Sequence, residues 1–231
     1  MLSFFKKFIK RYSFVFIFLQ NCKIFFLINL SKKTKINGRG NHIRINSKAG
    51  LSSCGFNIIG DNNSIDIEGN VFLKNVFFKI LGNNNHILIS DGTKFVRSGE
   101  LWMEDDNCEI VIDKYSTFEE VHIAVTESGS KVYIGKDCMF AYDIDIRTGD
   151  SHSIINSLTG ERINYAKNIE IGNHVWVASH VSILKGAKIC DNSVVATRSV
   201  LSRPFDKMGI LIGGIPAIQL KEGITWDRKR L

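Results

Sequence analysis

The chain has 231 residues, of which 44% are hydrophobic and 23% are charged, and its formal net charge is +7. The charge is uneven, because residues 1–60 contain eleven Lys or Arg and no Asp or Glu, whereas residues 61–231 contain 19 basic and 23 acidic residues. The length fits one domain or one domain with an appendage. The body of the chain lacks the basic stripe of a nucleic-acid reader, so nucleic acid is excluded as a partner.

Residues 1–36 form a basic, aromatic segment. Its aromatic and aliphatic residues recur at spacings of three, four and seven, and four cations lie near the start: Lys6, Lys7, Lys10 and Arg11. This pattern predicts an amphipathic helix on an anionic membrane surface, at the cytoplasmic side of the inner membrane. A helix that caps the folded body remains the alternative. Gln20, Asn21 and Lys23 interrupt the apolar run and argue against a membrane span.

Residues 37–134 carry a loose repeat. Four asparagines stand 22 residues apart, each followed by alternating apolar residues: Asn41, Asn63, Asn85 and Asn107. Alternation predicts strands, and asparagine tolerates the left-handed backbone of tight corners. We expect stacked coils of a β-helix, with extra residues in one corner and the asparagines in a ladder.

Residues 135–212 carry a tighter repeat of six. An aliphatic residue occupies every sixth position from Ile171 to Leu201, namely Ile171, Val177, Ile183, Ile189, Val195 and Leu201. A small or β-branched residue follows four positions after each of the first five. Six is a multiple of the strand period but not of the helical one, so both sets point to one side of an extended chain. The pattern predicts a hexapeptide β-helix.

The hexads stop after Ile146 and resume at Ile171. The intervening stretch 147–167 is polar and contains His152. A loop of this length in a regular solenoid is usually functional. An imidazole can take a proton near neutral pH, which makes His152 the candidate general base.

The five cysteines at positions 22, 54, 108, 138 and 190 form no Cys-x-x-Cys pair. Their odd number and their places in the repeats indicate small packed residues of a reducing compartment, not disulfides or zinc ligands. No Ser or Cys stands beside a histidine at a spacing typical of an activated nucleophile, so a covalent enzyme intermediate is not favoured.

Several motifs together resemble one family. They are Ile171-Gly-Asn-His-Val-Trp-Val177, Ile183 to Ser193, Gly135-Lys-Asp-Cys-Met, Glu161-Arg-Ile-Asn, Gly213-Gly-Ile-Pro-Ala217 and Ile224-Thr-Trp226. Over residues 130 to 226 the chain is similar to the hexapeptide-repeat acyltransferases, and among them to sugar and capsular polysialic acid O-acetyltransferases. The resemblance implies an all-β, left-handed parallel β-helix, acetyl-coenzyme A as acetyl donor, a carbohydrate acceptor and a homotrimer.

The resemblance also implies roles for individual residues. His152 occupies the place of the family's base after Thr148-Gly149, although two residues separate Gly149 from His152 here. Trp176 corresponds to a residue beside the acceptor. Arg147, Glu161 and Arg162 are candidate sugar contacts, or else they tie the loop to the coil. The candidate contacts for coenzyme A are Ser179, Ala196, Arg203 and Lys221. Ser202 stands where the capsular enzymes have an aromatic residue.

A metal site is not expected. His174 and His180 are six residues apart and therefore lie on successive faces of the prism, too far apart to share one zinc within a monomer.

We therefore predict an O-acetyltransferase of a bacterial surface polysaccharide, in which residues 1–36 form an N-terminal helix, 37–134 the wide coils, 135–212 the hexapeptide region with its ejected loop, and 213–231 a C-terminal tail. Two alternatives remain: an N-acetyltransferase of a nucleotide-linked amino sugar, and a non-catalytic scaffold of a glycan-assembly complex.

Overall fold

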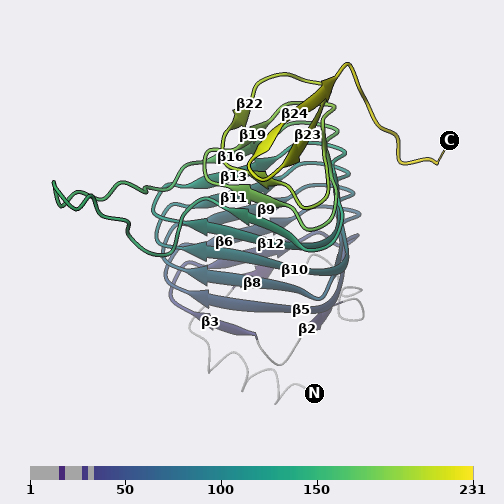
Figure 1. Ribbon diagram of the computed structural model, residues 1–231. Helices are drawn as coiled ribbons and strands as arrows, with labels where there is room; N and C mark the ends of the chain where they lie inside the picture. The colour runs from purple at the N-terminus through teal and green to yellow at the C-terminus, as the bar shows by residue number, and fades with distance from the viewer. Residues whose placement is uncertain (1–15, 19–27, 31–33, 231) are drawn as a thin grey trace, which may run out of the picture.

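The computed structural model describes residues 16–18, 28–30 and 34–230. Within these ranges the chain contains strands and no helix. The strands stack as successive coils of a solenoid, and one long loop and the C-terminal tail leave it on opposite sides (Figure 1). The front strands run from right to left while the coils rise from the N-terminal end, so the winding is left-handed. The predicted all-β, left-handed parallel β-helix is confirmed.

One sheet forms a flat face of the prism. In spatial order its described strands are β1 (Phe16–Phe18), β4 (His42–Ile45), β6 (Ser64–Ile67), β9 (His86–Ile89), β11 (Glu109–Ile112), β13 (Lys131–Ile134), β16 (Ile169–Ile171), β19 (Lys188–Ile189) and β22 (Pro204–Phe205). Neighbouring strands are parallel.

The second sheet covers the other two faces, because its longest strands bend around the corner between them. Its main path is β2 (Ile28–Leu30), β5 (Gly50–Ile59), β7 (Phe72–Lys74), β10 (Lys94–Glu104), β12 (Thr117–Thr126), β14 (Met139–Phe140), β17 (Trp176–Val177), β20 (Val194–Val195), β23 (Ile210–Gly214) and β24 (Ala217–Glu222). The strands beside this path are β3 (Lys35–Asn37), β8 (Val76–Leu81), β15 (Ile144–Arg147), β18 (Ser182–Leu184) and β21 (Val200–Leu201). The last pair, β23 and β24, is an antiparallel hairpin that ends the stack.

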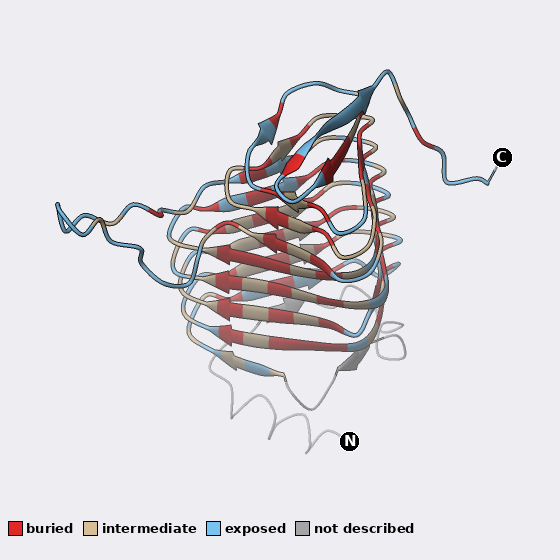
Figure 2. Cartoon of the chain, in the orientation of Figure 1, coloured by how far each residue is buried: buried red, intermediate tan, exposed pale blue. Residues whose placement is uncertain are grey.

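The hexad residues are buried, and Figure 2 shows buried positions alternating with less buried ones along the strands. All six aliphatic positions from Ile171 to Leu201 are buried, and so are the small residues that follow them, including Ser193 and Ser199. The hydroxyl of Ser199 donates to the carbonyl of Ala196 at 2.7 Å, so this polar side chain is satisfied inside the coil. The predicted register of the hexapeptide region is confirmed.

The asparagine ladder is present but shorter than predicted. The side-chain oxygen of Asn41 accepts from the backbone N–H of Asn63 at 2.9 Å, and that of Asn63 accepts from Asn85 at 3.0 Å. On the next coil the side-chain oxygen of Asn85 accepts a hydrogen bond from the backbone N–H of Cys108, not of Asn107. This coil holds one extra residue, so Asn107 turns outward with φ of 59° and Cys108 takes the buried place.

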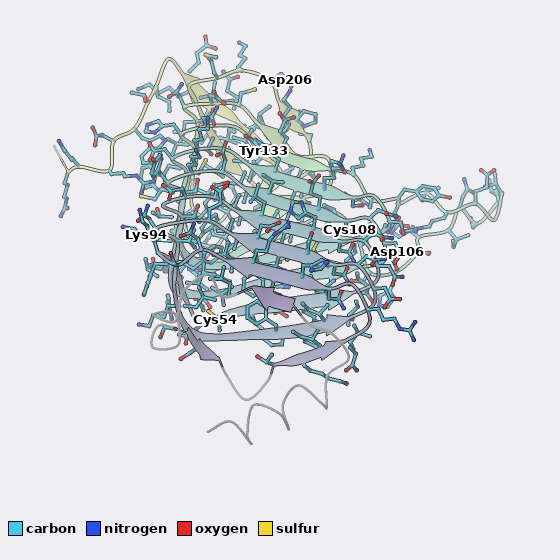
Figure 3. All side chains as sticks on the ribbon, turned by 180° about the vertical axis from the view of Figure 1, so that it is seen from behind. Cys54, Lys94, Asp106, Cys108, Tyr133 and Asp206 are labelled. Atoms are coloured by element: carbon cyan, nitrogen blue, oxygen red, sulfur yellow. The ribbon has the colours of Figure 1, made fainter. Side chains whose placement is uncertain are left out.

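One edge of the prism accommodates the variation in coil length. We call this edge the loop corner. At it the chain passes from the end of one strand, such as β12, β15 or β18, to the next strand of the face made of β4 to β22. The wide coils place Gly60–Asn63 and Glu127–Ser130 there, and residues 148–168 leave from the same corner. In Figure 3, Asp106 and Cys108 lie on the side from which the loop protrudes. Despite the loop, β13 and β16 pair directly, with Val132 opposite Ile169.

The helix predicted over residues 1–36 falls mostly outside the described residues. Where this segment is described, the prediction is wrong, because β1, β2 and β3 are strands. Ile17 pairs with Ile43 and Ile36 with Ile58, so these short stretches extend the sheets of the first coil. Aromatic residues such as Phe16 and Phe18 occur in strands as well as in helices, so their spacing alone does not distinguish the two. Pairing with β4 makes this stretch a strand. Among the described residues there is no helix long and apolar enough to cross a membrane.

Candidate functional site

The 148–168 loop extends from the loop corner as a narrow arm. Ile155 and Arg162 form an antiparallel bridge that joins its two strands. Beyond this bridge the arm ends in a turn whose amides bind the side chain of Asn156. The arm exposes apolar side chains, and Leu158 at its tip is 93% exposed. Apolar side chains gathered on an exposed arm are a feature of interaction surfaces.

The root of the arm is ordered by one buried amide. Asn164 is 6% exposed. Its Nδ2 donates to the carbonyl of His152 at 2.8 Å and to Oδ2 of Asp150 at 2.9 Å, and its Oδ1 accepts from the N–H of Ile154 at 2.7 Å. Asn164 therefore fixes the backbone on both sides of His152 and leaves the exposed imidazole free to meet a substrate.

Two ion pairs attach this root to the solenoid. The ammonium of Lys185 binds Asp150 and also donates to the carbonyl of Asn164 at 3.1 Å. The hydrogen bond from Lys185 lowers the pKa of Asp150, so the carboxylate is charged at neutral pH. The guanidinium of Arg162 makes a two-pronged contact with Glu127 on the preceding coil.

The two arginines proposed as sugar contacts are both paired. The contact of Arg162 with Glu127 is the one expected if Arg162 attaches the loop to the coil. Arg147 lies at the end of β15, and its Nε donates to Asp145 at 2.6 Å. Asp145 also binds Nδ1 of His122 at 2.9 Å. Arg147 keeps its outer edge half-exposed beside the loop, so its proposed contact with the acceptor stays a prediction.

Trp176 lies away from His152 within one chain. It begins β17, directly after the corner formed by residues 135–138 and 172–175, which we call the tail corner. The loop corner and the tail corner are at opposite ends of the β4 to β22 face, and Figure 1 shows the loop and the tail pointing in opposite directions. Within one chain His152 and Trp176 therefore lie at different corners of the prism.

The four candidate contacts for coenzyme A are split between places. Ser179 and Ala196 share the third corner on adjacent coils, where Thr197 donates to the carbonyl of Ser179 at 2.8 Å. The N–H of Ala196 is used within the solenoid, since it donates to Ile212 at 2.8 Å. Arg203 is exposed at the loop corner, and Lys221 is exposed on β24. The backbone N–H of Ala196 is therefore not free for a ligand, and the proposed contacts of Ser179, Arg203 and Lys221 with coenzyme A stay predictions.

The two hexad histidines are structural corner residues. His174 and His180 adopt the left-handed backbone, with φ of 52° and 60°. Nδ1 of His174 contacts Asp137 at 2.8 Å, and Nδ1 of His180 contacts Asp143. In the described part of the chain, no three His, Cys, Asp or Glu side chains gather as a metal site would require.

The described cysteines are free thiols. Cys54, Cys108 and Cys138 are buried in the core. Burial raises the pKa of the Cys138 thiol to about 12, so it stays protonated at neutral pH and is a poor nucleophile.

Comparison with solved structures decides the family. The crystal structure of the polysialic acid O-acetyltransferase OatWY matches 84% of this chain and 91% of its own, with a TM-score of 0.79 and 34% identity. The chain belongs to the hexapeptide-repeat acyltransferases. The polySia-specific acetyltransferase NeuO matches 87% of this chain and 89% of its own, with a TM-score of 0.70 and 29% identity.

Curated sequences of this acyltransferase family agree. The chain is 36% identical over 123 residues to the polysialic acid O-acetyltransferase of Neisseria meningitidis and 32% identical over 120 residues to that of Escherichia coli O1:K1 / APEC. These matches cover 57% and 38% of the relatives, so the chain spans about half the length of the curated relatives it matches. No protein-family model matches the chain.

Three residues that order the candidate site were given no role in the sequence analysis. Asn164 and Lys185 hold the root of the loop, and Trp226 packs beside Trp176. Asn164 is the last residue of the Glu161-Arg-Ile-Asn motif and Trp226 is the last residue of the Ile224-Thr-Trp226 motif, so the resemblance drew attention to both stretches but to neither side chain. Lys185 gave no signal, because a lone lysine after a strand is ordinary surface.

Proposed function

We propose that the protein transfers acetyl from acetyl-coenzyme A to a hydroxyl of a bacterial surface polysaccharide, with a polymer of sialic acid as the first acceptor to test. The match to OatWY carries this proposal, since it covers most of both chains at 34% identity. The geometry of the loop supports it, because the His152 backbone is fixed while its ring is exposed.

In this reaction His152 takes the proton of the acceptor hydroxyl as that oxygen attacks the carbonyl carbon of the thioester. The carbon–sulfur bond breaks, and the same imidazole returns the proton to the leaving sulfur. Asn164 and Lys185 hold the backbone that carries the imidazole, which limits where the base can meet the acceptor. In this proposal Arg203 or Lys221 binds a phosphate of the donor, and Arg147 contacts the acceptor.

The function is tested with purified full-length protein, acetyl-coenzyme A and polysialic acid, by following free thiol release and the acetyl content of the polymer. Thiol release that depends on the polymer supports the proposal. Transfer to a nucleotide-linked amino sugar in place of the polymer would indicate the N-acetyltransferase. No transfer to any glycan, with the fold intact, would indicate the scaffold.

We propose a homotrimer as the active form. The exposed apolar arm, with Ile155, Leu158 and Tyr165, supports this state. So does the separation of the loop corner from the tail corner, since a second copy would bring His152 near Trp176.

Light scattering of the purified protein should therefore give three times the chain mass at micromolar concentration. Leu158→Glu should weaken this assembly and lower activity together, because a carboxylate replaces an apolar contact at the arm tip. Thr159→Glu, at the neighbouring exposed position, is the matched control. A fully active monomer would contradict the proposal.

We also propose that the basic N-terminal segment contacts an anionic membrane surface, which would make the protein peripheral on the cytoplasmic side of the inner membrane. Its charge supports this, as residues 1–60 carry eleven cations and no acid. Each cation near such a surface contributes about 1 kcal/mol.

Replacing Lys6, Lys7, Lys10 and Arg11 by glutamine should therefore abolish binding to vesicles with anionic lipid, as measured by co-sedimentation at low salt. This change keeps β1, β2 and β3, which a deletion of residues 1–36 would remove. Acetyl transfer to soluble polymer should be unchanged. If the unaltered protein ignores such vesicles, the segment has another role.

A further inference from the structure

The C-terminal tail ends in an anchored tryptophan. The Trp226 ring stacks on the His174 ring, with centroids 4.2 Å apart and planes 9° from parallel. Its Nε1 donates to the carbonyl of His174 at 2.7 Å. Trp226 is 8% exposed although the residues around it are largely exposed. The tail therefore docks through one specific side chain.

The partners of His174 fix the position of this ring. Nδ1 contacts the carboxylate of Asp137 at 2.8 Å, and Nε2 contacts the carbonyl of Trp226 at 3.0 Å. Each ring nitrogen of His174 thus faces one oxygen, the first from the coil and the second from the tail. The His174 ring is held between the coil and the tail.

Arg228 closes the other side. Its Nε donates to Asp137 at 3.0 Å and its Nη1 to the hydroxyl of Thr117 at 2.8 Å. The guanidinium carbon also stands 5.6 Å from the centroid of the Trp226 ring. His174, Asp137 and Arg228 thus form a clamp around Trp226 that spans coils far apart in the sequence.

The clamped ring borders Trp176. The two indole centroids are 6.2 Å apart and the planes are tilted by 48°. Trp176 is 37% exposed and faces outward from β17, between Met139 and Val194 on the neighbouring strands. The Trp226 ring packs beside the Trp176 ring and therefore restricts the orientations that the Trp176 ring can adopt.

We propose that Trp226 is a positioning residue that holds Trp176 in the orientation in which it binds the acceptor sugar, and that residues 224–228 thereby set affinity for the glycan. This rests on the proposed function, in which Trp176 contacts the acceptor. A side chain that binds a sugar face must be held by packing, because small displacements of a binding group cost large factors in rate.

The kinetic test compares Trp226→Ala and Trp226→Phe in the full-length protein, with acetyl-coenzyme A and polysialic acid. Trp226→Ala should raise the KM for the polymer about tenfold and leave the KM for acetyl-coenzyme A within about twofold. Trp226→Phe keeps a ring against Trp176 and should recover most of the loss. Trp102→Phe, on another face of the prism, is the matched control and should behave as the unaltered protein.

The spectroscopic test needs no acceptor. The chain has three tryptophans, so Trp102→Phe/Trp226→Phe and Trp102→Phe/Trp226→Ala each leave Trp176 as the sole indole. Acrylamide should quench Trp176 more strongly, and its anisotropy should fall, in the protein with alanine. Equal quenching and equal anisotropy in the two proteins would overturn the proposal.

The outcomes distinguish a failure of the Trp226 proposal from a failure of the proposed function. If unaltered protein does not acetylate polysialic acid but Trp176 loosens as expected, the positioning holds and the proposed acceptor is wrong. If transfer occurs and Trp226→Ala lowers only the melting temperature, with both KM values and kcat unchanged, the tail is merely structural. Should Trp226→Ala not fold, Arg228→Gln opens the same clamp, and an unchanged KM for the polymer would then overturn the proposal.

Discussion

Replacing His152 with alanine should lower kcat by about 10²–10⁴-fold, the usual contribution of a positioned acid–base group. The KM for acetyl-coenzyme A should change little, because the imidazole meets the acceptor hydroxyl and the thioester, not the nucleotide. His152→Asn keeps a polar side chain but cannot take the proton, so it should be nearly as inactive. Steady-state thiol release measures both variants.

The pH dependence provides a second measurement on the same residue. Activity should rise with pH along an acidic limb, because a protonated imidazole cannot accept a proton, and this limb should vanish in His152→Asn. The ion pair at the loop root responds to a lower pH range. The hydrogen bond from Lys185 lowers the pKa of Asp150 below the ordinary value of an aspartate, about 4. The stability that this pair contributes is therefore complete above that pH and is lost only as the pH falls through the lowered pKa.

His180→Ala is the matched control for His152, since His180 is a corner residue with a carboxylate partner and lies outside the loop. His174 cannot serve as a second control, because it holds Trp226. Retention of most activity in His152→Ala would mean that the base lies elsewhere. Loss of activity in His180→Ala, or on chelation, would restore the metal hypothesis.

The second large effect concerns the solenoid itself. Ile183→Asp should destabilise the protein by more than about 3 kcal/mol, because Ile183 is completely buried between Ile146 and Leu201 and a carboxylate there has no partner. The expected measurement is a strongly lowered melting temperature or loss of soluble protein. Leu184→Asn changes the neighbouring outward-facing residue and should cost far less. Cooperative melting of Ile183→Asp at the temperature of the unaltered protein would contradict the register.

The sequence allowed the fold of the hexapeptide region to be predicted in detail, since inward positions such as Ile171 and Val177 repeat without interruption. The wide coils were less certain. An extra residue in the corner before Cys108 shifted the ladder by one position, and a count of asparagines alone cannot reveal which of two neighbours turns inward. The N-terminal segment was misjudged where it is described, because aromatic spacing does not separate strand from helix when the strands are short.

The site was predictable only in part. The length and polarity of the loop pointed to His152, and the resemblance pointed to Trp176. The contacts that order them could not be predicted, because Arg162 meets Glu127 across 35 residues and Trp226 meets His174 across 52. Such contacts depend on which corners coincide in the stacked coils and on the reach of individual side chains, and neither follows from a repeat period.

The loop corner has a consequence for how such enzymes diversify. Strands β13 and β16 pair as adjacent rungs although 37 positions separate Val132 from Ile169, while β16 and β19 pair across only 18. The pairing of adjacent coils therefore does not depend on the number of residues inserted at this corner. We therefore expect that the part of the arm beyond the root held by Asn164 can change in length and composition without re-registering the coils, as long as the root that carries His152 is kept.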